Sequence, residues 1–82
     1  MSIHTRTRSI LASLSGRQEE TLHPEMNLVD DLGVDSLSKC EFVMLLESAF
    51  GVRINDDHAE QMQTVGDAFA VVERRLAHPG PA

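Results

Sequence analysis

The sequence predicts an all-α fold made of three longer helices and one short helix. Apolar residues recur at helical spacing in three segments of the chain. Capping residues or glycines stand at the ends of these segments, and a long polar connection separates the first from the second. The 82 residues form one domain, and a domain of this size buries only about 60% of the surface that its unfolded chain exposes. It has no room for both a core and a deep active site.

The first helix is predicted from the spacing of Ile3, Ile10, Leu11 and Leu14, which places these residues on one side. Gly16 ends this pattern, and glycine is the residue expected just beyond the C-terminus of a helix. The stretch 17–34 that follows is polar and shows no sustained apolar period, so it is predicted to be a long first loop. Long loops inside small domains are often functional. The apolar anchors of this loop are Leu22, Met26, Leu28 and Leu32.

The second helix is bracketed by Asp35 and Ser36, which supply N-cap chemistry, and by Gly51, which provides a stop. One broad arc of this helix is apolar, as expected for the side that packs on a core. We expect this arc to be buried. Its members are Phe42, Val43, Leu45, Leu46, Ala49 and Phe50.

The opposite side of the second helix carries an additional apolar stripe. Leu37, Cys40 and Met44 fall together there, with Glu41 and Glu47 beside them. An apolar strip edged with carboxylates favours docking to a partner that has an apolar groove and a basic rim. Scattered exposed apolar residues are also normal in proteins, so the spacing alone leaves both interpretations open.

The last third of the chain predicts a short third helix and a longer fourth helix. Residues 52–54 alternate like a short extended link, and Asn55 then caps a brief helix through Asp56, Ala59 and Met62. Thr64 and Asp67 form a variant capping box that opens the fourth helix. Its buried face is predicted to contain Val65, Ala68, Phe69, Val72 and Leu76. We expect one domain over residues 1–77 and a disordered C-terminal tail over residues 78–82.

The charge of the chain favours protein partners over nucleic acids. Seven basic and thirteen acidic residues give a net charge of -6. Residues 19–67 contain twelve acids and two bases, a net charge of -10, which repels phosphate backbones and attracts basic protein surfaces. Cys40 is the single cysteine and fits a reducing compartment, and no apolar run is long enough to cross a membrane. We expect a cytoplasmic monomer without a membrane span.

The sequence offers no catalytic or metal site. The four histidines are scattered, without the spacing that places two ligands on one helix face, so we expect them to be solvated surface residues. Cys40 has no base beside it, and the neighbouring Glu41 disfavours a thiolate. A calcium loop starting at Asp30 would require ligands where Leu32 and Val34 stand. We therefore predict neither catalytic residues nor metal ligands.

Ser36 is the one position with distinctive chemistry. The turn over residues 30–35 delivers this serine to the start of a helix, where free N–H groups and the helix dipole favour a phosphate. Ser36 is therefore a good acceptor for a phosphodiester, although nothing nearby activates it as a nucleophile. On the residues alone, a role as a helix cap is the favoured interpretation of Ser36.

The segment 31–37, DLGVDSL, resembles the attachment motif of the acyl carrier protein family. The serine of that motif carries 4'-phosphopantetheine, and an aspartate nearly always precedes it. The similarity continues through residues 41–44, 50–52 and 64–67 and covers nearly the whole chain from position 3 to position 76. The tripeptide Asp-Ser-Leu is common, whereas the extended match is specific.

The resemblance implies a four-helix bundle with a long first loop and a short third helix. It also implies covalent 4'-phosphopantetheine on Ser36, taken from coenzyme A by a phosphopantetheinyl transferase, with Asp35 in support. The carrier then serves acyl-transferring and acyl-modifying enzymes in fatty-acid, specialised lipid or polyketide biosynthesis and is not itself an enzyme. The residues expected to meet the basic docking patches of these partners are Leu37, Glu41, Met44 and Glu47.

Two alternatives remain open beside an acyl carrier. An aminoacyl or peptidyl carrier would use the same arm for a different cargo, and an unmodified acidic helical adaptor would dock without any arm. Three positions depart from the pattern usual in fatty-acid carriers, namely Lys39, Cys40 and Ser48, and they thin the negative surface beside the arm. These departures favour a specialised carrier with its own set of partners.

Overall fold

The computed structural model describes residues 2–78, which form four α-helices and one 3-10 turn. The expected all-α bundle is confirmed, with a long first loop and a short third helix. Within the described residues the only β-type pairing is an isolated bridge between Asn27 and Thr64. The elements are α1 (Ile3–Ser15), η1 (Glu19–Thr21), α2 (Ser36–Phe50), α3 (Asp56–Glu60) and α4 (Val65–Ala77).

The ends of the helices follow from local sequence signals. Gly16 and Gly51 close α1 and α2 in the left-handed conformation, with φ of 71° and 65°, which glycine adopts without steric cost. Thr64 and Asp67 form the expected capping box of α4, because each side chain accepts a backbone N–H of the other residue. At α3, the Asn55 side chain accepts the His58 N–H, as the sequence predicted for this cap.

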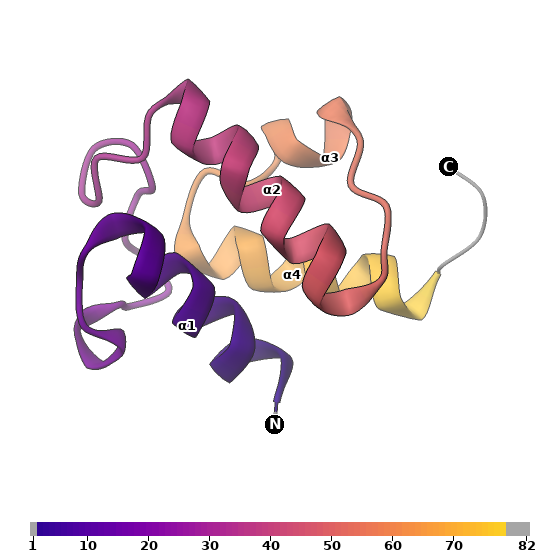
Figure 1. The fold of residues 1–82 in the computed structure, drawn as a ribbon, viewed down its shortest axis with the longest axis horizontal. Coiled ribbons are helices and arrows are strands. Elements are labelled where there is room, and N and C mark those ends of the chain that lie inside the picture. Colours follow the sequence, from indigo (N-terminus) through magenta and orange to yellow (C-terminus); the bar gives the residue numbers. More distant parts are fainter. Residues whose placement is uncertain (1, 79–82) are drawn as a thin grey trace.

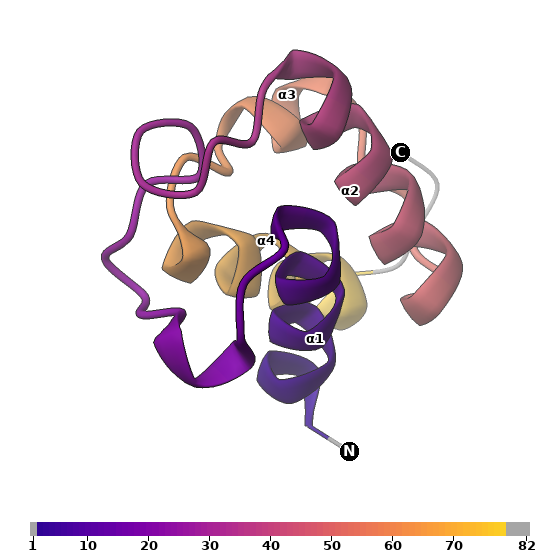
Figure 2. The same cartoon turned by 60° about the vertical axis from the view of Figure 1, so that its left-hand side comes forward.

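The three longer helices surround the core. α1 packs against both α2 and α4, and α3 lies beside the first half of α2 (Figures 1 and 2). Phe42 and Leu46 of α2 are fully buried, as predicted, and α4 contributes a nearly continuous apolar face. Deep burial of such side chains is the main stabilising contribution in a domain of this size. The other fully enclosed apolar side chains include Leu11, Leu28, Met62, Val65, Ala68 and Val72.

The first loop is anchored rather than free. Leu22, Leu28 and Leu32 are buried in the core, as their sequence pattern predicted, and Met26 is half-buried. Backbone hydrogen bonds join this loop to the connection before α4: the Leu28 N–H donates to Gln63 O and the Val65 N–H donates to Met26 O. These contacts hold the segment that leads into α2 in one place.

The prediction that Leu45 is buried was wrong, because 42% of this side chain is exposed. Leu45 lies at the edge of the apolar arc, where it lines an open groove between α1 and α2 that also contains Ile10 and Leu14. Conversely, Thr7 and Val71 are buried without having been predicted to be. Burial at the edges of a helix face depends on how closely the neighbouring helix approaches, which periodicity does not encode.

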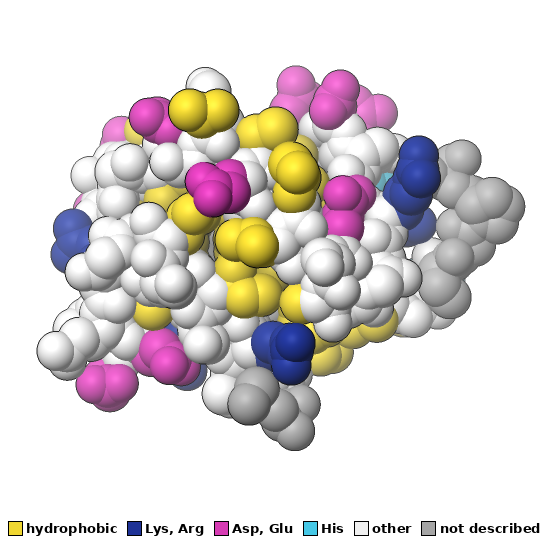
Figure 3. Space-filling model, in the orientation of Figure 1, with side chains coloured by type: hydrophobic (Ala, Val, Ile, Leu, Met, Phe, Trp, Pro, Cys, Tyr) yellow, Lys and Arg dark blue, Asp and Glu magenta, His cyan; other side chains and the backbone are white. Residues whose placement is uncertain are grey.

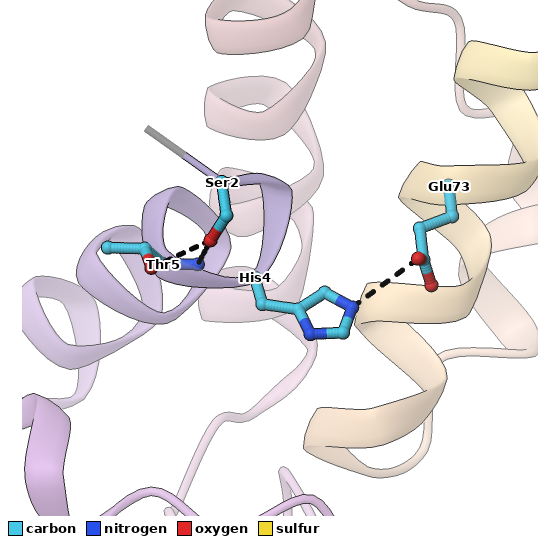
Figure 4. A network of polar contacts seen from close by, with 4 residues as sticks. All are labelled: Ser2, His4, Thr5 and Glu73. Atoms are coloured by element: carbon cyan, nitrogen blue, oxygen red, sulfur yellow. Dashed lines mark hydrogen bonds and ion pairs between the residues drawn. The ribbon is translucent and has the colours of Figure 1, made fainter.

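A polar network joins the beginning of α1 to α4 (Figure 4). The His4 ring stacks on Phe69, with 4.3 Å between the ring centroids, and His4 Nε2 lies 3.4 Å from Glu73 Oε2. The N-cap of α1 is Ser2, whose hydroxyl oxygen accepts the Thr5 N–H. These contacts stabilise the end of the bundle where α1 begins.

The C-terminal end of α4 is capped by backbone. The His78 N–H donates to Arg74 O and caps this helix. The tail predicted over residues 78–82 otherwise lies outside the described residues, and the domain boundary at residue 77 stays a prediction. Among residues 2–78, the helices are too short or too polar to cross a membrane.

Candidate functional site

Hydrogen bonds within residues 27–31 fix the loop that leads to the start of α2. Asn27 Oδ1 accepts the N–H groups of Val29 and Asp30, and the Asp31 carboxylate accepts the Asn27 N–H at 2.8 Å. Asn and Asp side chains form such turns readily because they bond to nearby backbone. Gly33 follows with a φ of 68°. The loop before Ser36 is therefore a defined turn.

Asp35 is the N-cap of α2. Its Oδ1 accepts the Ser38 N–H at 2.8 Å. This backbone hydrogen bond, followed by one from the Ser38 hydroxyl, lowers the pKa of Asp35 below its ordinary value, because both bonds favour the carboxylate. The aspartate is therefore charged at neutral pH, and its carboxylate accepts a backbone N–H that would otherwise lack a partner in the first turn of the helix.

Ser36 is thereby released from a capping role. Its side chain is exposed, and within residues 2–78 its hydroxyl makes no hydrogen bond. It stands at the first position of α2, where the positive end of the helix dipole favours an attached phosphate. The exposed, unengaged hydroxyl and this favourable field fit a phosphodiester at Ser36.

A hollow of about 430 Å³ opens beside Ser36, between α2 and α3. Val43, Ile54 and Ala59 give it apolar surface, and Asp56 and Glu60 contribute carboxylates from the α3 side. The hollow was not predicted, since it depends on where α3 lies. It offers an apolar shelter, next to the serine, for a chain attached there.

Lys39 and Cys40 also line this hollow. Lys39 was expected to thin the negative surface beside the arm, and the structure places it half-buried in the wall that contains Ser36. Cys40 is a free, exposed thiol. Both residues thus lie beside Ser36 rather than within the core.

The outward side of α2 carries the predicted apolar stripe. Leu37 is 80% exposed and Met44 is 63% exposed, and Cys40 and Glu41 are exposed as well. Figure 3 shows apolar side chains following α2 across this face, with acidic side chains next to them. We call the exposed set Leu37, Cys40, Glu41 and Met44 the outward stripe.

Glu47 differs from the outward stripe. It is half-buried, and its Oε2 accepts the Ile54 N–H at 2.8 Å. One oxygen of the carboxylate therefore holds the link between α2 and α3. Glu47 and Met44 also line a second open hollow, of about 650 Å³, next to this link.

The histidines are placed at different parts of the molecule. His4 belongs to the contact with Glu73, while His23 and His78 are exposed. The expectation of a solvated residue was wrong for His58, which is half-buried and whose Nδ1 accepts the Asn55 N–H in the capping box of α3. Among residues 2–78, no three His, Cys, Asp or Glu side chains gather as metal ligands would.

Comparisons with known proteins find one family along nearly the whole chain. A family model described as a phosphopantetheine attachment site matches residues 5–72. An acyl carrier protein of Desulforapulum autotrophicum is 43% identical over 76 residues, which cover 92% of this chain and 99% of that protein.

Solved structures of acyl carrier proteins have the same fold. The holo acyl carrier protein of Nitrosomonas europaea superposes with a TM-score of 0.79 at 26% identity, over 95% of this chain and 100% of that one. The acyl carrier protein of Enterococcus faecalis gives a TM-score of 0.70 at 32% identity, over 88% of this chain and 95% of that one.

Proposed function

Because the chain belongs to the acyl carrier protein family, we propose that Ser36 is the residue to which its 4'-phosphopantetheine is covalently attached, with Asp35 in support. The chain is an acyl carrier and bears this group. When attached, the group supplies a terminal thiol that holds acyl groups as thioesters. Proteins of this family are carriers rather than catalysts.

The geometry of the α2 N-terminus supports Ser36 as the attachment residue. Asp35 already caps the helix, so the serine hydroxyl is exposed and unengaged within the described residues. This is the observation that carries the proposal, because it removes the main structural reason for a serine at this position. Within the described residues the Ser36 hydroxyl makes no hydrogen bond to a basic group, so a phosphopantetheinyl transferase is expected to activate it with its own groups.

The hollow between α2 and α3 supports a sheltering role. Val43, Ile54 and Ala59 offer apolar contact near Ser36. Each methylene that leaves water there contributes about 0.8 kcal/mol. A medium-length acyl chain is thus protected and still releasable, because the hollow stays open to solvent along its edge.

We propose that partners dock on α2. Leu37 and Met44 provide exposed apolar contact, and Glu41 provides a charge that attracts a basic patch. Glu47 contributes with the oxygen that is not bonded to Ile54, and its half-buried position makes it the weakest of the four. Such contacts form quickly and weaken with salt. The expected partners are the phosphopantetheinyl transferase and acyl-transferring and acyl-modifying enzymes.

The carrier is proposed to act as a cytoplasmic monomer in fatty-acid, specialised lipid or polyketide biosynthesis. An aminoacyl or peptidyl cargo is the alternative, and incubation of the holo carrier, whose thiol is free, with ATP, amino acids or fatty acids and the matching adenylating enzymes distinguishes the two. Transfer of amino acids but not of acyl groups would overturn the acyl cargo.

Intact mass tests the attachment residue. The protein is incubated with coenzyme A, Mg²⁺ and a broad-specificity phosphopantetheinyl transferase, next to Ser36→Ala and to Ser48→Ala, an exposed serine on the same helix. We expect a gain of one phosphopantetheine in the parent and in Ser48→Ala but not in Ser36→Ala. A gain in Ser36→Ala would place the arm elsewhere, and no gain in any of them would favour an unmodified acidic adaptor.

A further inference from the structure

Lys39 is the only lysine of the chain, and it stands one helical turn after Ser36. Residues three apart on a helix lie on the same side, with about 5–6 Å between their Cβ atoms. Both residues line the hollow between α2 and α3, and Lys39 is half-buried there. The four-carbon stem of a lysine spans this separation, so its ammonium group reaches a phosphate attached to the serine.

Apart from Lys39, the charged side chains around Ser36 are carboxylates, which repel a phosphodiester. Asp35 is a carboxylate at the same end of α2, and Asp56 and Glu60 line the hollow from α3. Within residues 2–78, Lys39 forms no ion pair with any of them, since the one ion pair within 4.0 Å joins His4 and Glu73. The ammonium group of Lys39 is therefore available, and among the described residues it is the only cationic side chain that lines this hollow.

We propose that Lys39 is a positioning residue for the arm: its ammonium group pairs with the phosphodiester that joins 4'-phosphopantetheine to Ser36. This inference rests on the attachment proposed above. The contact relieves the repulsion between the phosphodiester and the Asp35 carboxylate. It also draws the base of the arm to the side of α2 that faces the hollow, where Val43, Ile54 and Ala59 offer apolar contact. Because the pair is partly exposed, salt weakens it.

Nuclear magnetic resonance tests the contact directly. Protein labelled with ¹³C in lysine alone gives one Cε signal, because the chain has a single lysine. We expect this signal to shift when the apo protein is converted to the holo protein, and the shift to shrink as NaCl is raised from low to high concentration. Intact mass confirms conversion in each sample.

A thermodynamic cycle provides an independent reading. The difference in Tm between holo and apo protein is measured in the parent and in Lys39→Gln, with Lys39→Arg as the conservative variant. We expect Lys39→Gln to lower this difference by about 1–8 °C, the range of an exposed ion pair in a domain of this size. Lys39→Arg is expected to restore it. The matched control is Arg53→Gln, which removes one positive charge from outside this hollow.

The outcomes separate the attachment at Ser36 from the role of Lys39. If the parent gains no mass, the attachment proposal fails and this inference fails with it. If the mass gain occurs but the lysine signal is unchanged and the cycle gives the same difference as Arg53→Gln, the attachment stands and the role of Lys39 is overturned. A lysine signal that already responds to Asp56→Asn in the apo protein and not to conversion would assign the ammonium group to α3 instead.

Discussion

The two sides of α2 have similar side chains but opposite environments. Phe42 and Leu46 face inward and are fully buried, whereas Leu37 and Met44 face outward and are 80% and 63% exposed. The inward side stabilises the folded state because its apolar area is buried. The outward side contributes little to stability, and its apolar groups remain available for a partner. Side chains that the fold does not need are therefore the ones that point to function.

The largest expected effect is on the inward side. Phe42→Ala removes a fully buried aromatic ring and is expected to cost about 3–5 kcal/mol of the free energy of unfolding. Met44→Ala, two residues later on the same helix, is expected to stay within about 0.5 kcal/mol of the parent. Urea denaturation followed by circular dichroism measures both. Equal losses for the two variants would erase the distinction between the two sides.

The outward side is expected to matter for partner recognition. Met44→Ala and Leu37→Ala should each lower kcat/KM of the phosphopantetheinyl transferase for the apo protein about 5- to 30-fold, equivalent to about 1–2 kcal/mol for a central interface residue. The control is Val29→Ala, an apolar side chain that is 57% exposed but lies in the first loop. A similar loss in Val29→Ala would show that exposed apolar area in general, and not the outward stripe, determines recognition.

Leu45 lies between the inward and outward sides of α2, so its substitution tests where the boundary between them falls. Since 42% of its side chain is exposed in the groove beside α1, Leu45→Ala is expected to cost about 1 kcal/mol of the free energy of unfolding. The same urea experiment measures it. A loss as large as that of Phe42→Ala would mean that the groove closes over Leu45 and that this residue belongs to the inward side.

The smallest expected effect is a pH dependence at the start of α2. The folded pKa of Asp35 is lowered, so its contribution to stability is present above the ordinary pKa of an aspartate and is lost as the pH falls through the folded pKa. We expect the stability difference between the parent and Asp35→Ala to be constant near neutral pH and to shrink in acid. Urea denaturation at a series of pH values checks this, and a difference that grows in acid would contradict it.

The sequence predicted the elements of the fold because their signals are local. Gly16, Gly51, Asn55 and Thr64 mark helix ends through short-range backbone chemistry, and each stands where predicted. The 3-10 turn η1 was missed, because a polar segment of three residues has no periodicity to detect.

The site was predicted only in part. Ser36, its position at a helix start and the exposure of Leu37 and Met44 follow from spacing along one helix. The hollow between α2 and α3 does not, since it depends on the position of α3 relative to α2. The location of Lys39 in that hollow and the hydrogen bond from Ile54 to Glu47 depend on the same long-range arrangement.

The most direct test of the account is to locate the arm by peptide mass spectrometry of the modified protein. Trypsin cleaves after Arg17 and Lys39, and the resulting peptide 18–39 contains two serines, Ser36 and Ser38. Fragmentation of the bonds between these serines assigns the added mass to one of them. We predict phosphopantetheine on Ser36 alone. The added mass on Ser38, or on a peptide outside residues 18–39, would contradict it.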